Sequence, residues 1–329
     1  MSRVVRFHRT GGPEVLQVDK VDVPPPGPGE VRIQVKALGL NRAESMFRSG
    51  QYLETPKPPS RLGYEAAGPV ESVGPGVSGL KPGDAVSTIP AFLQGQYGVY
   101  GDLVVVPVAA VAKHPTNLSW NEAASIWMQY LTAYGALIDI AQMKAGDTVL
   151  IPAASSSVGL ASIQLANMVG ATPVALTRKG DKRQTLLNHG AKHVIVTDEQ
   201  DLVAETQKLT SGKGARIVFD PVGGPTVARL TAAMAPRGIL FQYGALSTEP
   251  TPLPLFDIIG KSITIRGYIL FEITSDPDRL AKATEFVIGG LASGKLKPII
   301  AKTFLFEQIV EAHRFLESNA QVGKVVVTV

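Results

Sequence analysis

The sequence has no cysteine among its 329 residues. This absence excludes disulfide bonds, thiolate catalysis and every zinc site that depends on cysteine ligands. The histidines show no spacing typical of metal ligands, so we expect them at the surface or at helix caps. They are His8, His114, His189, His193 and His313. The sequence therefore predicts no metal site.

Long apolar runs are also missing. The longest run, Leu103–Ala112, is too short to cross a bilayer and contains Pro107. The first residues lack the apolar segment of a secretory signal peptide. We therefore predict a soluble, cytoplasmic protein that has no membrane partner.

The chain has no large excess of either charge. Its 32 basic and 28 acidic residues leave a formal net charge of +4. This balance is too even to indicate nucleic acid as a partner. Hydrophobic residues make up 45% of the chain and charged residues 18%, which is the composition of a folded protein with room for two domains.

The most informative stretch of the sequence runs from Thr148 to Gly170. It opens with a short β-branched run typical of a buried parallel strand, Thr148–Ile151, and small residues follow. From Val158 onward, apolar residues recur at the spacing of one helix face. Strand, small-residue turn and helix form the first βα unit of dinucleotide-binding folds, where the helix N-terminus faces a pyrophosphate. An ordinary strand-to-helix turn of another α/β protein would show the same pattern.

The glycine fingerprint of such a turn is only partly present. At the three positions of G-x-G-x-x-G the chain has Ala154, Ser156 and Gly159. Gly159 would let helix and strand pack closely. The Ser156 hydroxyl would donate to a phosphate oxygen in place of the close backbone approach that a glycine allows.

A cationic turn follows the second strand of this unit. NAD-binding proteins hold the ribose 2′-hydroxyl with a carboxylate at this strand tip, but here the tip is Thr177 followed by Arg178. Positive charge at the tip suits the 2′-phosphate of NADP. A solvated basic surface turn is the alternative interpretation. Together with the preceding βα unit, the turn favours NADPH as the cofactor.

Two patterns of secondary structure divide the chain. Residues 1–124 hold short β-branched runs between proline- and glycine-rich turns, which predicts a compact barrel. From residue 148, strands alternate with helices, which predicts a doubly wound parallel sheet. The predicted strands are 4–7, 15–18, 31–37, 65–73, 85–89, 103–107, 148–151, 174–177, 193–196, 217–220, 239–242 and 262–266. We predict one helix over 121–137 and a C-terminal strand, helix and strand that return to the first domain.

Several sparse motifs occur together in one order: G-G-P-E-V-L (11–16), P-G-P-G-E-V (26–31), N-R-A-E-S-M-F-R-S-G-Q-Y (41–52), L-G-Y-E-A-A-G-P-V (62–70), P-G-D-A-V (82–86), A-A-S-S-S-V-G-L (153–160) and G-K-V-V-V (323–327). With these motifs the chain resembles the medium-chain dehydrogenase/reductase superfamily over essentially its whole length. It is most similar to the zinc-independent quinone oxidoreductase (zeta-crystallin-like) branch.

This resemblance implies an α/β architecture with three segments. They are a GroES-like β-barrel catalytic domain over 1–124, a doubly wound Rossmann NADP-binding domain over 125–267, and a segment over 268–329 that returns to the catalytic domain. The resemblance also implies NADPH as the cofactor and a homodimer.

Cofactor contacts are implied at several positions. Thr132 resembles the family's nicotinamide-side threonine, and Lys182 matches a lysine that follows the second strand in the relatives. The family also places contacts at the end of the fifth strand. The complete set of cofactor-binding candidates is Asn41, Thr132, Ser155, Ser156, Ser157, Val158, Gly159, Thr177, Arg178, Lys182, Thr197, Tyr243 and Gly244.

The chain departs from its zinc-dependent relatives at the metal. Those relatives have a ligand cysteine at the position of Asn41 and a ligand histidine at the position of Tyr64. Near the C-terminus, Asn319 replaces an arginine common in some relatives, so part of the phosphate contact is missing. The catalytic candidates are Asn41, Tyr52 and Tyr64, which would donate to the substrate oxygen. Each of them also suits a plain packing or turn-closing role.

Without a metal or a thiol, the chemistry that remains is that of the cofactor. The sequence predicts a zinc-independent, NADPH-dependent oxidoreductase that transfers hydride to a small molecule, a quinone or an α,β-unsaturated carbonyl. Two alternatives stay open. One is a 2-enoyl-thioester reductase, and the other is a non-catalytic, crystallin-like protein that binds NADPH.

Overall fold

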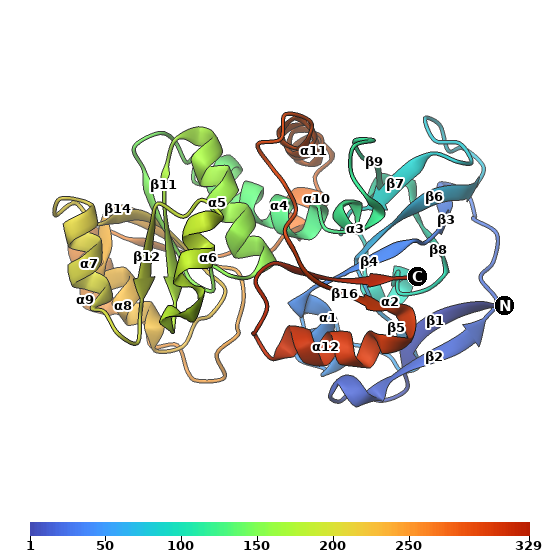
Figure 1. Cartoon of the computed structure of the whole chain (residues 1–329), viewed down its shortest axis with the longest axis horizontal. Coiled ribbons are helices and arrows are strands. Elements are labelled where there is room, and N and C mark those ends of the chain that lie inside the picture. Colours follow the sequence, from blue (N-terminus) through green and yellow to red (C-terminus); the bar gives the residue numbers. More distant parts are fainter. The chain divides into compact units, whose positions relative to one another are not determined.

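The computed structural model describes residues 1–329 and divides into two compact units (Figure 1). The first unit contains residues 1–128, 274–280 and 297–329, and the second contains residues 129–273 and 281–296. The chain after residue 268 is therefore shared between the two units. None of the helices has the length and apolar composition needed to span a membrane.

The first unit is built on β-sheets. Its strands are β1 (Ser2–Phe7), β2 (Leu16–Val21), β3 (Glu30–Gln34), β4 (Ala37–Leu40), β5 (Ser60–Arg61), β6 (Glu65–Val73), β7 (Ala85–Thr88), β8 (Leu103–Pro107), β9 (Val111–Lys113), β16 (Ile300–Leu305) and β17 (Lys324–Thr328). The larger sheet has the order β16-β17-β4-β6-β3-β8, with β7 joined to β6 and β9 to β7, and a smaller sheet has the order β2-β1-β5. The C-terminal strand β17 thus lies antiparallel beside β4, with Val325 opposite Leu40.

Strand and helix patterns explain the core of this unit. In β3 the buried Val31 and Ile33 alternate with less buried neighbours, as expected for a strand with one face on the core. The helices are α1 (Arg42–Arg48), α2 (Gln94–Tyr97), α3 (Trp120–Ala123) and α12 (Ile309–Glu317). Along α12 the buried residues recur at steps of three and four, and this apolar face packs against the barrel and against α1.

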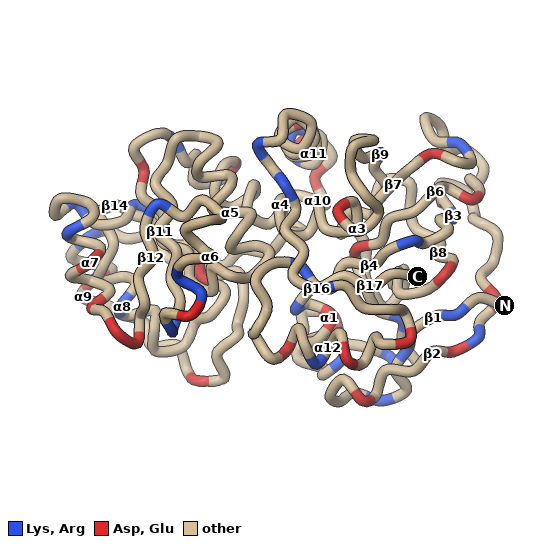
Figure 2. Tube along the Cα trace, in the orientation of Figure 1, with Lys and Arg blue, Asp and Glu red and all other residues tan.

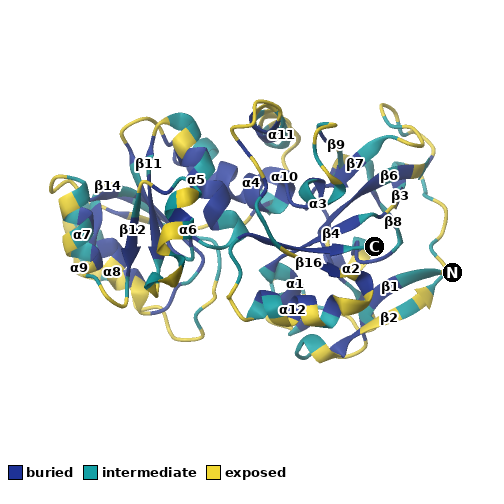
Figure 3. Cartoon of the chain, in the orientation of Figure 1, coloured by how far each residue is buried: buried dark blue, intermediate teal, exposed yellow.

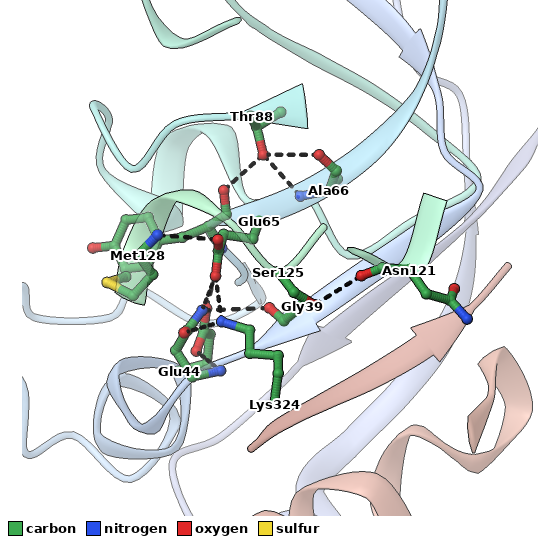
Figure 4. A network of polar contacts seen from close by, with 11 residues as sticks. Gly39, Glu44, Glu65, Ala66, Thr88, Asn121, Ser125, Met128 and Lys324 are labelled. Atoms are coloured by element: carbon green, nitrogen blue, oxygen red, sulfur yellow. Dashed lines mark hydrogen bonds and ion pairs between the residues drawn. The ribbon is translucent and has the colours of Figure 1, made fainter. Parts of the chain in front are cut away.

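The single helix predicted over 121–137 is wrong, because the structure interrupts it. After α3, the chain turns and restarts as α4 (Trp127–Ala133), which continues as a π-helix from Tyr134 to Ile140. The Met128 N–H donates to the Glu65 carboxylate at 3.0 Å rather than to a helix carbonyl (Figure 4). The Ser125 hydroxyl bonds back to the Asn121 carbonyl. A buried side chain from β6 therefore accepts from the first turn of the second helix, where α4 begins.

The second unit has a six-stranded parallel sheet. Its strands are β10 (Thr148–Ile151), β11 (Thr172–Thr177), β12 (His193–Val196), β13 (Ala215–Asp220), β14 (Met234–Gln242) and β15 (Thr264–Gly267), in the order β12-β11-β10-β13-β14-β15. The strand order reverses beside β10, and ligands of such sheets bind at the carboxyl ends of the strands at that point. This arrangement confirms the predicted doubly wound fold.

Helices cover the sheet of the second unit. They are α5 (Ser157–Val169), α6 (Arg183–Asn188), α7 (Leu202–Leu209), α8 (Thr226–Ala232) and α9 (Leu255–Lys261), while α10 (Phe271–Thr274) and α11 (Pro277–Ala292) follow the last strand. The inner strands β10, β11 and β13 are mostly buried, and the outer helix faces are exposed (Figure 3). Basic and acidic residues are interspersed along the chain in each unit (Figure 2). The core is thus apolar, and neither unit has a long stretch of one charge.

Candidate cofactor-binding and active-site residues

The turn between β10 and α5 has the geometry of an anion-binding helix start. Ser156 is the N-cap of α5, and its Oγ accepts a hydrogen bond from the Gly159 N–H at 3.1 Å. A Cβ on Gly159 would lie 2.6 Å from the Ala154 carbonyl oxygen, so only glycine allows this close packing. Ala153 has a φ of 49°, a left-handed conformation that non-glycine residues seldom adopt outside functional turns.

The predicted serines and Val158 therefore surround the N-terminus of one helix. Ser157 and Val158 begin α5, and the side chains of Ser155, Ser156 and Ser157 are partly exposed. The first N–H groups of a helix have no intrahelical acceptor and carry the positive end of its dipole. Because the Ser156 oxygen accepts from Gly159, its hydroxyl proton remains able to donate outward, and its contact with a phosphate stays a prediction.

A lysine from the next βα connection reaches this turn. The Lys182 Nζ donates to the Ser155 Oγ at 3.2 Å. Partial burial lowers the pKa of Lys182, the nearby Asp181 opposes that shift, and the charge of Arg178 adds to it. The structure thus brings two of the predicted cations close to each other and one of them onto the serine turn.

The tips of β11 and β12 are tied together beside these cations. The Thr197 N–H donates to the Thr177 carbonyl at 2.8 Å, and the Thr177 hydroxyl donates to the Lys179 carbonyl at 3.2 Å. These bonds fix the backbone from which Arg178 projects. Thr177 and Thr197 therefore shape the rim, and their contact with a cofactor stays a prediction.

The end of β14 packs against the end of β13. The Tyr243 ring stacks on Phe219 with the ring centroids 3.9 Å apart, and its N–H donates to the Asp220 carbonyl. A Cβ on Gly244 would lie 2.7 Å from the Pro221 carbonyl oxygen. Gly244 thus allows a close approach, and the group that approaches it in this structure is the backbone of Pro221. Roles of these two residues toward a cofactor stay predictions.

Thr132 lies buried in α4, two residues before the π-helix. Segments of π-helix occur frequently at functional sites. The Tyr268 hydroxyl fits into the notch left by Gly135 and donates to the Leu131 carbonyl at 3.4 Å. This contact holds the backbone next to Thr132, a support that sequence patterns do not reveal.

The remaining predicted residues belong to the first unit, and Asn41 is engaged there in internal hydrogen bonds. It precedes α1 as its N-cap, and its N–H donates to the Glu44 carboxylate at 2.7 Å. Its Nδ2 donates to Glu44 at 3.2 Å and to Glu65 at 3.1 Å, and its Oδ1 accepts from the Lys324 ammonium at 2.5 Å. Asn41 thus closes a strand-to-helix turn. A role toward a substrate or a nicotinamide ribose would compete with these bonds and stays a prediction.

Tyr52 and Tyr64, the two tyrosines of the first unit that are predicted as site residues, form a pair. The phenols of Tyr52 and Tyr64 interact with each other, and each shifts the pKa of the other. Tyr64 is fully buried, whereas Tyr52 is partly exposed. Burial raises the pKa of both phenols, so both are protonated donors at neutral pH. Tyr52 is therefore the outer member of the pair.

Sequence reasoning did not assign a role to three residues of the same region: Glu44, Glu65 and Lys324. All three are at most 1% exposed, and the Lys324 ammonium forms an ion pair with Glu65 (Figure 4). Burial raises the pKa of Glu44 to about 7, although the charge of Lys324 and the hydrogen bond from Asn41 act against it. The signal available was the glutamate three residues after Asn41, which marks a capping box.

Comparisons with known proteins place the chain in a family. It matches "Alcohol dehydrogenase GroES-like domain" over residues 27–116 and "Zinc-binding dehydrogenase" over residues 157–308. It is 32% identical to quinone oxidoreductase 1 of Escherichia coli (strain K12), over 98% of each chain. The chain belongs to the quinone oxidoreductase branch of the medium-chain dehydrogenase/reductase superfamily.

Other members of this superfamily differ in their named activities and cofactors. A 2-haloacrylate reductase of Burkholderia sp is 29% identical over 97% of each chain. A solved E. coli quinone oxidoreductase in complex with NADPH superposes with a TM-score of 0.91, at 32% identity and complete coverage of both chains. A solved NAD-dependent alcohol dehydrogenase reaches 0.90, at 34% identity and complete coverage.

The residues of the present chain do not fit the zinc ion that one of the two family descriptions names. Within residues 1–329, no three His, Cys, Asp or Glu side chains are grouped so that they could hold a metal. Zinc prefers thiolate and imidazole ligands. The corresponding positions carry the amide of Asn41, whose oxygen already accepts from an ammonium group, and the phenol of Tyr64. These two side chains are therefore unsuited to hold a catalytic zinc ion.

Proposed function

We propose that this member of the quinone oxidoreductase branch is a zinc-independent, NADPH-dependent reductase of quinones or α,β-unsaturated carbonyls. The contact of Lys182 Nζ with Ser155 Oγ, beside Arg178, carries the proposal because it puts positive charge on a helix-start phosphate site. The solved NADPH complex of the E. coli relative supports the cofactor. The 2-haloacrylate reductase supports an activated C=C as one acceptor.

The cofactor side of the reaction is binding and orientation. When bound, NADPH supplies the hydride. The first turn of α5 and the hydroxyls of Ser155, Ser156 and Ser157 would hold the pyrophosphate. Arg178 and Lys182 pair with the 2′-phosphate, and such charge-assisted bonds are each worth roughly 1.5–3 kcal/mol.

The acceptor side requires a donor for the oxygen on which negative charge develops. Tyr52 is partly exposed, and burial keeps its phenol protonated, so its hydroxyl can donate to the acceptor oxygen. Donors aimed at such an oxygen contribute about 10²–10³ in kcat. The anion left by hydride transfer, an enolate or a hydroquinone anion, then takes its one proton from water, so no further acid is needed.

The decisive experiment for the cofactor follows nicotinamide absorbance with NADPH and with NADH. We expect Arg178→Ala and Lys182→Ala to raise the KM for NADPH by about 10–100-fold, with much smaller effects on kcat and on the KM for NADH. Lys213→Ala, an exposed lysine of another loop, is the matched control. An unchanged KM for NADPH in both variants would refute the 2′-phosphate assignment.

The acceptor class is tested on the unmodified protein. A panel of quinones, enones and enoyl thioesters is offered with NADPH. Turnover of quinones or enones supports the proposal, and exclusive turnover of enoyl thioesters supports the thioester reductase instead. NADPH binding without oxidation by any acceptor supports the non-catalytic alternative.

A homodimer is the proposed assembly. Strand β15 (Thr264–Gly267) is an open sheet edge, and large exposed apolar side chains lie close before it in the sequence: Leu253, Leu255, Phe256 and Ile259. Such a combination of edge strand and apolar surface suits pairing with a second copy. Light scattering on Phe256→Asp/Ile259→Asp should give a monomer. A monomeric wild type would refute the dimer.

A further inference from the structure

A cluster of four buried polar side chains includes Asn41, which stands where zinc-dependent relatives carry a ligand cysteine, and Glu65, which directly follows the second such position, Tyr64. Asn41 is the N-cap of α1. Glu44 comes from the first turn of α1, Glu65 from β6 and Lys324 from β17 (Figure 4). Each side chain is at most 7% exposed. Buried charges persist only where they are paired and hydrogen-bonded. The identity of the cation in this cluster therefore matters to the whole first unit.

The cation is the ammonium of Lys324. Its Nζ donates to the Asn41 Oδ1 at 2.5 Å and forms an ion pair with a Glu65 oxygen. The same Glu65 oxygen accepts from the Asn41 Nδ2. Asn41 and Glu65 thus direct two oxygen atoms toward one positive charge, which is the arrangement that oxygen ligands give a metal ion.

The fold provides space for this lysine. On β4, a Cβ on Gly39 would lie 2.9 Å from the Lys324 Cε and 1.9 Å from the Ala124 carbonyl oxygen. Any larger residue at Gly39 would displace the lysine stem or the chain after α3. The glycine therefore keeps open the space through which Lys324 reaches the carboxylates.

The cluster also sets the start of α4. The second Glu65 oxygen accepts from the Met128 N–H, in the first turn of α4, at 3.0 Å. A carboxylate at this position stabilises a helix start. Holding Glu65 thus fixes the start of the helix that carries Thr132.

We infer that the Lys324 ammonium is the resident cation of this site and stands in for the metal ion of zinc-dependent relatives. Lys324 is a positioning residue: it holds Glu65 against α4 and Asn41 at the start of α1. Its effect on catalysis through Thr132 rests on the proposed function. The effects of Lys324 on cation binding and on thermal unfolding do not depend on the proposed function, so experiments can test them separately from that function.

Thermal unfolding of the full chain tests the pairing. Lys324→Met leaves Glu65 buried without its cation, and we expect it to lower Tm by roughly 10 °C. Adding Glu65→Gln to Lys324→Met removes the unpaired charge and should restore part of that loss. A wild-type Tm in Lys324→Met, or a double variant that is less stable than the single one, would overturn the inference.

Metal binding provides a readout that a merely structural lysine would not change. In Lys324→Ala, the oxygens of Asn41, Glu44 and Glu65 lose their cation, and hard oxygen ligands suit Mn²⁺. Electron paramagnetic resonance should show one Mn²⁺ bound at least 10-fold more tightly than in wild type, and the tighter binding should vanish in Lys324→Ala/Glu65→Gln. If Lys324→Ala does not fold, Mn²⁺ should restore its folding. Equal Mn²⁺ binding in Lys324→Ala and wild type, failure of that restoration, or stoichiometric zinc in wild type would overturn the inference.

Discussion

The titration of Glu44 makes stability of the first unit depend on pH in an unusual direction. Burial raises the pKa of this carboxyl from 4.5 to about 7. Because the folded state holds the proton more tightly, Glu44 contributes stability that is fully present below pH 4.5 and is lost as pH rises through 7. Carboxyl groups usually cost a protein stability as pH falls, so this contribution has a distinctive sign.

The magnitude follows from the two pKa values. One pKa unit corresponds to about 1.36 kcal/mol, so the rise of the pKa from 4.5 to about 7 amounts to about 3 kcal/mol in full. Between pH 5 and pH 8, the contribution of Glu44 should fall by about 2–3 kcal/mol. Glu44→Gln removes this titration, so the free energy of unfolding of the variant relative to wild type should rise by that amount over the same range.

Urea unfolding followed by tryptophan fluorescence measures this difference. Both tryptophans, Trp120 and Trp127, belong to the first unit, where Glu44 lies. The amide that Glu44→Gln introduces will face N–H donors that now point at a carboxylate, but that cost is the same at every pH and cancels in the comparison. Glu249→Gln, at an exposed position, should run parallel to wild type. Parallel profiles for Glu44→Gln and wild type would refute the reasoning.

Three further predictions concern other parts of the molecule. Burial, and then the charge of Arg48, lower the pKa of His313 from 6.5 to about 3, so His313 costs the folded state stability as pH falls below 6.5. Between pH 7.5 and pH 5, the free energy of unfolding should fall by about 2 kcal/mol less in His313→Phe than in wild type. An equal fall in both proteins would contradict this prediction. Tyr52→Phe should lower kcat by about 10²-fold with little change in the KM for NADPH, and an unchanged kcat would remove it as a donor. Gly159→Ala forces a methyl group against Ala154, so calorimetry should show NADPH affinity reduced by about 10-fold or more, whereas wild-type affinity would disprove the close packing.

Local sequence patterns predict the elements of this fold well where one face or one run decides burial. The predicted bounds of β6, β8, β10 and β12 coincide with the structure. Local patterns are less successful where the backbone N–H groups of a strand form hydrogen bonds with residues far away in the sequence. The run 31–37 divides into β3 and β4, because the Val35 N–H bonds to Asp102 and the Lys36 N–H bonds to Ala67.

The same distinction applies to the candidate site. Turn and helix patterns locate the serine turn, because its residues are consecutive in sequence. They do not locate the cluster of Asn41, Glu65 and Lys324, because Lys324 lies 259 positions after Glu65. Periodicity reports burial, but it does not report which buried charge meets which. Only the pairing of β17 with β4 brings these residues together.

The position of Lys324 in β17, the last strand of the fold, bears on how the protein matures during synthesis. A nascent chain would hold Glu44 and Glu65 together long before the ribosome has made their lysine. The first domain to emerge is therefore the last to be completed, and it waits for this strand while the nucleotide-binding domain folds. Loss of the strand, by premature termination or by proteolysis, would leave the barrel with unbalanced negative charge in its interior.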